Sequence, residues 1–339
     1  MLPTLRWLRF GTSLVITAFF LWLAVGHIRF EGVVTALKHI QWWWLTVAMI
    51  SLVCGYVARI YRWWWMLRAC NVAVTFGTCA WPLIVGFAIN NVVPFRAGDA
   101  FRIMGFREQL QTPAIRLLGT LVVERILDLT ILLVFLLVGV VVLTSNGVHI
   151  PYWHTVVVIS GLAIISWVFL SWGARLERSL CQVCNSKVLA SRGWVLLIKK
   201  HLQQLAIAVN VVRSPERALK LLVMSAVIWS FEGSIFAAVA YGLRYDGRAF
   251  GPWFALATGS LSTLLPSSPG YVGTFDFFTI SGLTAYGTNS TVAVATAFIV
   301  HGVLWLPLTI AGGTYLLFSS LRGRIVKSIE PLARPQEKT

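Results

Sequence analysis

Ionisable side chains inside long apolar stretches are the residues of this sequence best suited to chemistry. One such stretch opens with the run Glu124-Arg125-Ile126-Leu127-Asp128. On a helix the two carboxylates, four residues apart, share a face, and Arg125 can pair with Asp128. A charge at the centre of a membrane helix costs about 2.5–3.5 kcal/mol on insertion scales. Binding of a polar substrate and bracing by a structural ion pair explain this run equally well.

A second polar group follows an apolar segment that ends at a proline. Its sequence is Asn90-Asn91-Val92-Val93-Pro94-Phe95-Arg96-Ala97-Gly98-Asp99, with Arg102 shortly after. We expect Asp99 to cap a helix that starts near Gly98, where free N–H groups and the helix dipole attract anions. The guanidinium groups of Arg96 and Arg102 suit a phosphate. We favour anion binding over the alternative, an interfacial loop whose arginines extend toward lipid headgroups.

A third polar group interrupts the last apolar part of the chain. Its members are small, polar or helix-breaking: Pro266, Ser267, Ser268, Pro269, Gly270 and Gly273. We expect a flexible break here, with Asp276 capping or lining the helix that follows. Together with Pro94 and Gly98, these prolines and glycines are candidate hairpin or gate residues.

Glu232 and His301 are isolated ionisable residues in apolar runs. The ordinary interpretation is a protonated glutamate and a neutral histidine, each hydrogen-bonded to a neighbour. The functional alternative is that these residues take part in proton coupling.

Composition limits the class of protein in which these groups work. The chain has 339 residues, of which 58% are hydrophobic and only 12% charged, and its mean hydropathy is +0.78. About a quarter of the residues of a soluble domain are charged, so this chain cannot cover a globular surface. Soluble enzymes, disulfide scaffolds and disordered chains are excluded. The net charge of +16 lies in loops between apolar runs and indicates cytoplasmic loops on anionic lipid rather than nucleic-acid binding.

Signatures of other chemistry are missing from the sequence. It contains no Walker loop, no dinucleotide-binding glycine motif, no H-E-x-x-H and no G-x-S-x-G. The pair Cys181 and Cys184 lacks the further ligands of a zinc site. We therefore expect no cofactor, no metal, no catalytic residue and no direct coupling to ATP.

Six apolar segments are long enough to cross about 30 Å of hydrocarbon. They are residues 10–26, 42–61, 117–143, 154–173, 218–241 and 291–319. Tryptophan triplets at 42–44 and 63–65 bracket the second segment, as two interfacial aromatic belts would. Two further stretches, 78–94 and 252–287, are broken by proline, glycine and polar residues. We expect these to be re-entrant hairpins buried in protein or beside a wet cavity.

The order of these segments predicts an all-α membrane domain built from an inverted repeat. With both termini in the cytoplasm, 22 lysines and arginines face the cytoplasm and four face outward, which agrees with the positive-inside rule. Residues 1–145 then form one half and 146–320 the other, turned upside down because each half crosses three times. The second half includes a basic cytoplasmic loop, 174–217, and a basic tail follows at 321–339. This architecture is typical of secondary transporters.

The motifs resemble those of the flippase-like integral membrane family related to the transmembrane region of lysylphosphatidylglycerol synthases. That family's first signature is Asn-x-x-x-Pro-x-Arg-x-Gly-Asp/Glu followed by an arginine, which residues 90–99 and Arg102 match. Its Glu-Arg-x-x-Asp run matches residues 124–128, and its late Pro-x-x-Pro-Gly-x-x-Gly run matches residues 266–273. The three motifs occur in the family's order, and the resemblance covers nearly the whole chain.

The resemblance implies movement of a polar-headed lipid between leaflets, or a supporting role in envelope lipid or glycolipid assembly. Because the synthases continue into a soluble aminoacyl-transferase domain and this sequence stops at Thr339, we expect a transporter and not an aminoacyl-lipid synthase. The expected partners are an anionic phospholipid or lipid-linked intermediate and enzymes of lipid or glycan synthesis. The expected location is the plasma membrane, which in bacteria is the inner membrane.

Our hypothesis is a lipid flippase with alternating access. An anionic headgroup would dock near Arg96, Arg102 and the helix start at Gly98, helped by the other polar residues of the first two motifs: Asn90, Asn91, Asp99, Glu124, Arg125 and Asp128. Residues 266–273 would form the opposing gate. A membrane-embedded transferase would need paired carboxylates in the outward loops, where the sequence offers only the separated Glu31 and Asp246. A non-catalytic scaffold is the remaining alternative.

Overall fold

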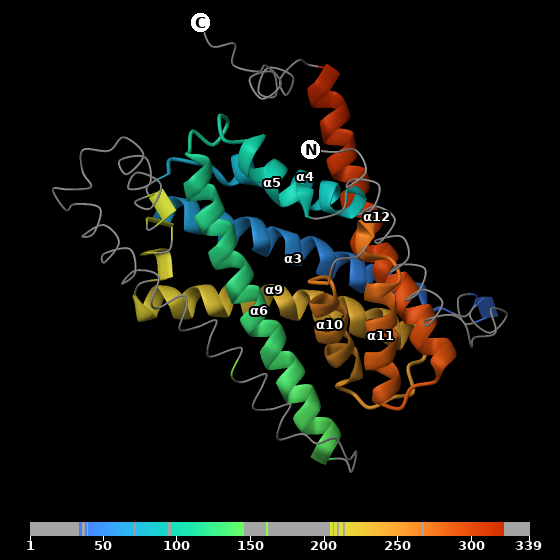
Figure 1. The fold of residues 1–339 in the computed structure, drawn as a ribbon. Coiled ribbons are helices and arrows are strands. Elements are labelled where there is room, and N and C mark those ends of the chain that lie inside the picture. Colours follow the sequence, from blue (N-terminus) through green and yellow to red (C-terminus); the bar gives the residue numbers. More distant parts are fainter. Residues whose placement is uncertain are drawn as a thin grey trace, which may run out of the picture. The chain divides into compact units, whose positions relative to one another are not determined.

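The computed structural model describes residues 40–70, 72–93, 96–145, 214–265 and 268–321, with isolated positions between 34 and 38, at 161 and between 204 and 212. These residues form eight α-helices, two short 3-10 helices and no strand (Figure 1). The α-helices are α3 (Trp42–Ala69), α4 (Phe76–Val92), α5 (Ala97–Met104), α6 (Ala114–Ser145), α9 (Pro215–Gly242), α10 (Gly251–Ser262), α11 (Thr274–Ala285) and α12 (Ser290–Leu321). The 3-10 helices are η1 (Asn210–Val212) and η2 (Pro269–Tyr271).

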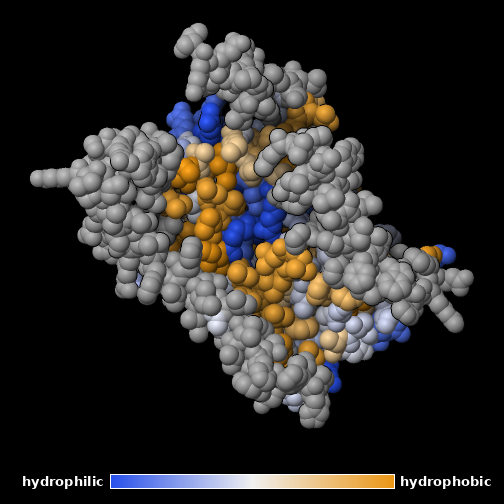
Figure 2. Space-filling view, viewed as in Figure 1, coloured by the Kyte–Doolittle hydropathy of each residue, from blue (hydrophilic) through white to orange (hydrophobic). Residues whose placement is uncertain are grey.

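Four of the helices, α3, α6, α9 and α12, are long and apolar enough to cross a membrane. They correspond to four of the six predicted spans, while the predicted spans 10–26 and 154–173 lie outside the described residues. Side chains such as Ile50, Val53 and Val57 of α3 point outward from one helix face and are about half exposed. Figure 2 accordingly shows hydrophobic residues over much of the described surface in that view, with a smaller hydrophilic patch among them.

The predicted hairpin at 252–287 contains two short helices, α10 and α11, that pack against each other. The predicted hairpin at 78–94 coincides with α4 alone, and the helix that packs against α4 is α5, which starts beyond that stretch at Ala97. A capping box of Thr75 and Thr78 starts α4. Between α10 and α11, Gly270 and Gly273 adopt φ angles of 69° and 84°, which side chains with a Cβ rarely tolerate. Pro94 and Pro266, which the sequence suggested as hairpin residues, lie outside the described part of the chain.

The order of helix lengths is the same in the two halves of the chain. The helices α3 and α9 have 28 residues, each is followed by two shorter helices, and α6 and α12 have 32 residues. The residues group into two compact units that do not coincide with these halves. The first unit takes residues 1–58, 128–166 and 224–306, and the second takes 59–127, 167–223 and 307–339. Each long helix therefore contributes one part to each unit.

Candidate functional site

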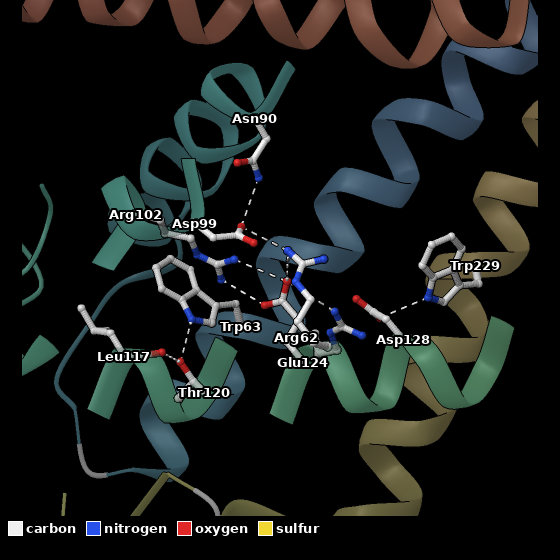
Figure 3. Close-up of polar contacts among 11 residues, drawn as sticks. Arg62, Trp63, Asn90, Asp99, Arg102, Leu117, Thr120, Glu124, Asp128 and Trp229 are labelled. Atoms are coloured by element: carbon white, nitrogen blue, oxygen red, sulfur yellow. Dashed lines mark hydrogen bonds and ion pairs between the residues drawn. The ribbon is translucent and has the colours of Figure 1, made fainter. Parts of the chain in front are cut away.

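A buried group of charged side chains occupies the second unit, where α3, α5 and α6 each contribute (Figure 3). Arg102 of α5 forms a two-pronged contact with Glu124 of α6, with Nη2 3.1 Å from Oε2 and Nη1 3.4 Å from Oε1. Nη2 of Arg62, on α3, lies 3.8 Å from Oε1 of the same glutamate. All three side chains are almost fully buried. The Glu124 carboxylate thus pairs with two buried guanidinium groups.

An aromatic ring fixes the Arg102 guanidinium from a second direction. Its central carbon lies 3.7 Å from the ring centroid of Trp63, a close cation–π contact. The indole N–H of Trp63 donates a hydrogen bond to the Thr120 hydroxyl at 3.3 Å, and that hydroxyl donates to the Leu117 carbonyl at 2.8 Å. The ring is therefore held in position by α6, the helix that also carries Glu124.

The more accessible edge of the cluster is formed by Arg125 and Asp99. Nη2 of Arg125 lies 3.2 Å from Asp99 Oδ1 and 3.9 Å from Glu124 Oε1, and the Arg125 side chain is 30% exposed. The amide of Asn90, on α4, donates to Asp99 Oδ1 at 3.2 Å. The same edge is thus supported by α4, α5 and α6.

The helix α5 is capped differently from our prediction. Asp99 does not cap it, because its carboxylate contacts Arg125 and Asn90 instead. The cap comes from Asn90 Oδ1, which accepts the Gly98 N–H at 2.8 Å. Arg96 occupies the N-cap position in the left-handed region, with φ 52°. The Gly98 N–H, one of those that we expected to attract an anion, therefore already has a partner within the protein.

The cluster brings charges of both signs together. Among the described contacts, the guanidinium groups of Arg62, Arg102 and Arg125 pair with the carboxylates of Glu124 and Asp99. Three of these five residues are nearly buried, whereas Arg125 and Asp99 retain 30% and 15% side-chain exposure.

Sequence reasoning missed several members of this cluster. The predicted second span ended at residue 61, but α3 continues to Ala69, so Arg62 and Trp63 lie inside a helix and are buried. The prediction that Trp63 belongs to an interfacial aromatic belt is therefore wrong. Arg59, one turn earlier and 6% exposed, lies 5.8 Å from the Phe87 ring. The available signal was the spacing of two arginines three residues apart, next to a tryptophan, in an apolar helix.

Other predicted site residues contact side chains of α12 and α9. Asn91 donates to the Thr309 hydroxyl of α12 at 3.0 Å. Asp128, in the first unit, accepts the indole N–H of Trp229 from α9 at 3.1 Å (Figure 3). Glu232 is half-buried on α9.

The structure does bring together the late motif and His301. The imidazole of His301, on α12, contacts both Asp276 of α11 and the backbone carbonyl of Gly270. Asp276 in turn accepts the N–H of Gly273. Among the described residues, no group of three or more His, Cys, Asp or Glu side chains could hold a metal ion.

A helical chain with four apolar helices of membrane-spanning length, and with arginine–carboxylate contacts buried between helices, defines a multi-pass membrane protein. The chain belongs to the lysylphosphatidylglycerol synthase transmembrane-region family, whose model matches residues 11–312. It is also similar to a UPF0104 membrane protein of Methanocaldococcus jannaschii, with 24% identity over 336 residues, 89% of this chain and 93% of that protein. The family resemblance that the sequence motifs indicated is thereby confirmed.

Proposed function

We propose that this protein moves a polar-headed lipid, with an anionic or phosphate-bearing headgroup, between the two leaflets of a membrane. The observation that carries the proposal is the gathering of three guanidinium groups around Glu124, of which the Arg125 group is 30% exposed. Guanidinium groups bind phosphate oxygens through charge-assisted hydrogen bonds. The cluster therefore favours phosphate or another anion over a neutral headgroup.

Within the cluster we propose that Arg125 is the residue that binds and releases the lipid headgroup. Glu124 and the Trp63 ring hold Arg102 firmly, whereas Arg125 is the most accessible of the three arginines. Its contact with Asp99 is a single pair at 3.2 Å, which a phosphate oxygen can replace. Guanidinium groups bind phosphate through two parallel hydrogen bonds, so Arg125 could grip a headgroup without disturbing the buried core.

The repeated order of the helices supports a transport mechanism. Two sets of one long, two short and one long helix are what an inverted repeat with two re-entrant hairpins would produce. Six spans in total would follow if residues 10–26 and 154–173 also cross. We propose that rocking of one repeat against the other alternates access to the site, in a plasma membrane and with both termini cytoplasmic.

A leaflet assay tests the proposal directly. The parent protein is reconstituted into vesicles that contain traces of fluorescent phosphatidylglycerol or phosphatidylcholine, and dithionite destroys the label in the outer leaflet only. We expect the parent to expose inner-leaflet phosphatidylglycerol to dithionite faster than protein-free vesicles do, and Arg125→Gln to slow it at least tenfold. The matched control is Arg68→Gln, because Arg68 lies at the exposed end of α3 against Trp64, outside the cluster.

Two results would overturn the proposal. One is a parent protein that leaves every labelled lipid in its original leaflet, which would shift support to a scaffold for lipid- or glycan-synthesis enzymes. The other is equal transport by the parent, Arg125→Gln and Arg68→Gln, which would remove the arginine cluster from the mechanism.

A further inference from the structure

A histidine and an aspartate are buried together in the first unit, where α11 and α12 meet the connection between α10 and α11. Nδ1 of His301 lies 2.8 Å from Oδ1 of Asp276, and its Nε2 lies 2.9 Å from the carbonyl oxygen of Gly270. The Asp276 side chain is fully buried, and the His301 side chain is 14% exposed. The second carboxylate oxygen of Asp276 accepts the Gly273 N–H at 2.9 Å.

The partners of His301 determine how many protons the pair must hold. A backbone carbonyl only accepts hydrogen bonds, so Nε2 must carry a proton to bond to Gly270. The contact between Nδ1 and Asp276 needs one more proton, located either on the ring or on the carboxyl group. Both arrangements, imidazolium with carboxylate and imidazole with carboxylic acid, contain two protons and no net charge. A pair that makes both of these contacts as hydrogen bonds therefore holds two protons and is neutral overall.

Loss of one proton to water breaks one of these two contacts. A ring with its remaining proton on Nδ1 keeps Asp276 but turns a lone pair of Nε2 toward the Gly270 oxygen. A ring protonated on Nε2 instead faces the carboxylate with a lone pair of Nδ1 at 2.8 Å. The first arrangement is favoured because it retains the contact with the charged and fully buried group. The connection at Gly270 is then released.

We infer that Asp276 and His301 form a proton-binding site that fastens residues 268–273, the end of the connection between α10 and α11, to α12. In the transport cycle proposed above, on which this step rests, the bound proton is the coupling ion. Binding closes the connection, and release of the proton frees it. The positive φ angles of Gly270 and Gly273 place flexible residues where the released segment must move.

Few ionisable residues lie on the described elements around this pair. In the described part of the unit, α10 has no ionisable residue and α11 has Asp276 alone. Asp276 is also the ionisable residue that bonds to His301, whose ring is packed edge-on against Phe275 at 5.1 Å. Other ionisable residues of the surrounding elements are Cys54 and Tyr56 on α3, Asp128 on α6, Glu232 and Tyr241 on α9, and Tyr271 in the connection.

Two substitutions fix the site in opposite states. Asp276→Asn presents an amide that donates to Nδ1 and still accepts from Gly273, so it imitates the neutral carboxylic acid and holds the connection closed at every pH. His301→Leu has neither a donor nor an acceptor, so it leaves both contacts unmade. The pair of variants therefore separates proton control from mere packing.

Hydrogen exchange of the parent and both variants in lipid nanodiscs tests the site without any transport measurement. From pH 5 to 9.5, after correction for intrinsic exchange rates, we expect residues 268–277 of the parent to lose at least tenfold in protection as the pH rises. Asp276→Asn should stay protected and His301→Leu should stay unprotected throughout. Identical pH dependence in the parent and Asp276→Asn would overturn the inference.

A second measurement guards against a misfolded variant. The ring nitrogen signals of His301 in ¹⁵N-histidine-labelled parent protein, assigned by their loss in His301→Leu, should shift over the same pH range. Signals that do not move would also overturn the site. Transport then tests the coupling: a proton gradient should drive lipid movement by the parent and not by Asp276→Asn. If exchange responds to pH while no lipid moves, the proposed function fails but the proton site stands; lipid movement indifferent to the gradient would refute the coupling alone.

Discussion

Trp63 and Glu124 hold the Arg102 guanidinium between them. The ring of Trp63 lies 3.7 Å from the guanidinium carbon, and Glu124 receives two of its N–H groups at 3.1 and 3.4 Å. One partner comes from α3 and the other from α6, so this single side chain of α5 ties three helices together. The arrangement leaves the Arg102 side chain little conformational freedom. We therefore interpret Arg102 as a structural residue that supports the more exposed Arg125.

Substitution of Trp63 should reveal the contribution of the ring. Trp63→Phe keeps an aromatic face and loses the hydrogen bond to Thr120, so we expect a loss of about 1 kcal/mol of stability. Trp63→Leu also loses the cation–π contact and should cost roughly 1–2 kcal/mol more. Unfolding in mixed micelles with rising SDS, followed by circular dichroism, measures both. Equal stability of the two variants would show that the ring face does not bind Arg102.

Glu124 should be the most sensitive residue of the cluster. Glu124→Gln removes the carboxylate that Arg62 and Arg102 share and leaves their charges buried, so we expect a loss of about 3–5 kcal/mol. The double variant Arg102→Met/Glu124→Gln removes one of the stranded charges and should recover part of that loss. The same SDS titration checks both. A double variant less stable than Glu124→Gln would mean that Arg102 acts mainly through packing.

Much of the fold could be predicted because hydrophobic length is a local property. The ends of α6, α9 and α12 lie within three residues of the predicted spans, and the polar breaks were recognised from proline and glycine. The end of α3 was missed because arginines and tryptophans at positions 59–65 have the composition of a membrane boundary. Of these residues, Arg62 pairs with a carboxylate 62 positions further along the chain, that of Glu124, and no local pattern specifies that pairing.

The site was predictable to a similar degree. Residues of the first two motifs, including Asn90, Asp99 and Arg102, do meet, because α4 packs against α5 and side chains of α5 contact α6. The identity of the cap was not predictable. Asp99 has the usual type and position for a cap, but Asn90 reaches Gly98 because α4 and α5 approach closely at that glycine. Packing between α4 and α5, rather than the N-cap propensity of a residue type, therefore decides which side chain caps α5.

Gly98 should accept no larger residue. A Cβ at this position would lie 1.9 Å from the carbonyl oxygen of Gly86 and 2.8 Å from the backbone nitrogen of Asn90. Because these are backbone atoms, Gly98→Ala must separate α4 from α5, and we expect a loss of about 3 kcal/mol or more. Gly77→Ala is the control on α4, because nothing lies within 4 Å of its Cβ, and it should stay within about 0.5 kcal/mol of the parent. Comparable losses in the two variants would contradict the close approach.

Asp246, in the connection between α9 and α10, should give the protein a measurable acid sensitivity. Its carboxylate accepts hydrogen bonds from the Thr288 hydroxyl and the Asn289 N–H, and the Thr288 bond in particular lowers the pKa of Asp246 below its usual 3.8. Because the pKa is lower in the folded state, these bonds stabilise the protein above the usual value, and their contribution is lost as the pH falls through the lowered one. Thr288→Val removes the hydroxyl donor, so the pKa of Asp246 should rise toward 3.8. Carboxyl NMR titration of the parent and Thr288→Val measures this shift, with Thr291→Val as the control because Thr291 bonds Asn289 through its backbone N–H. A parent and a Thr288→Val variant that titrate at the same pH would show that the hydroxyl does not stabilise the carboxylate.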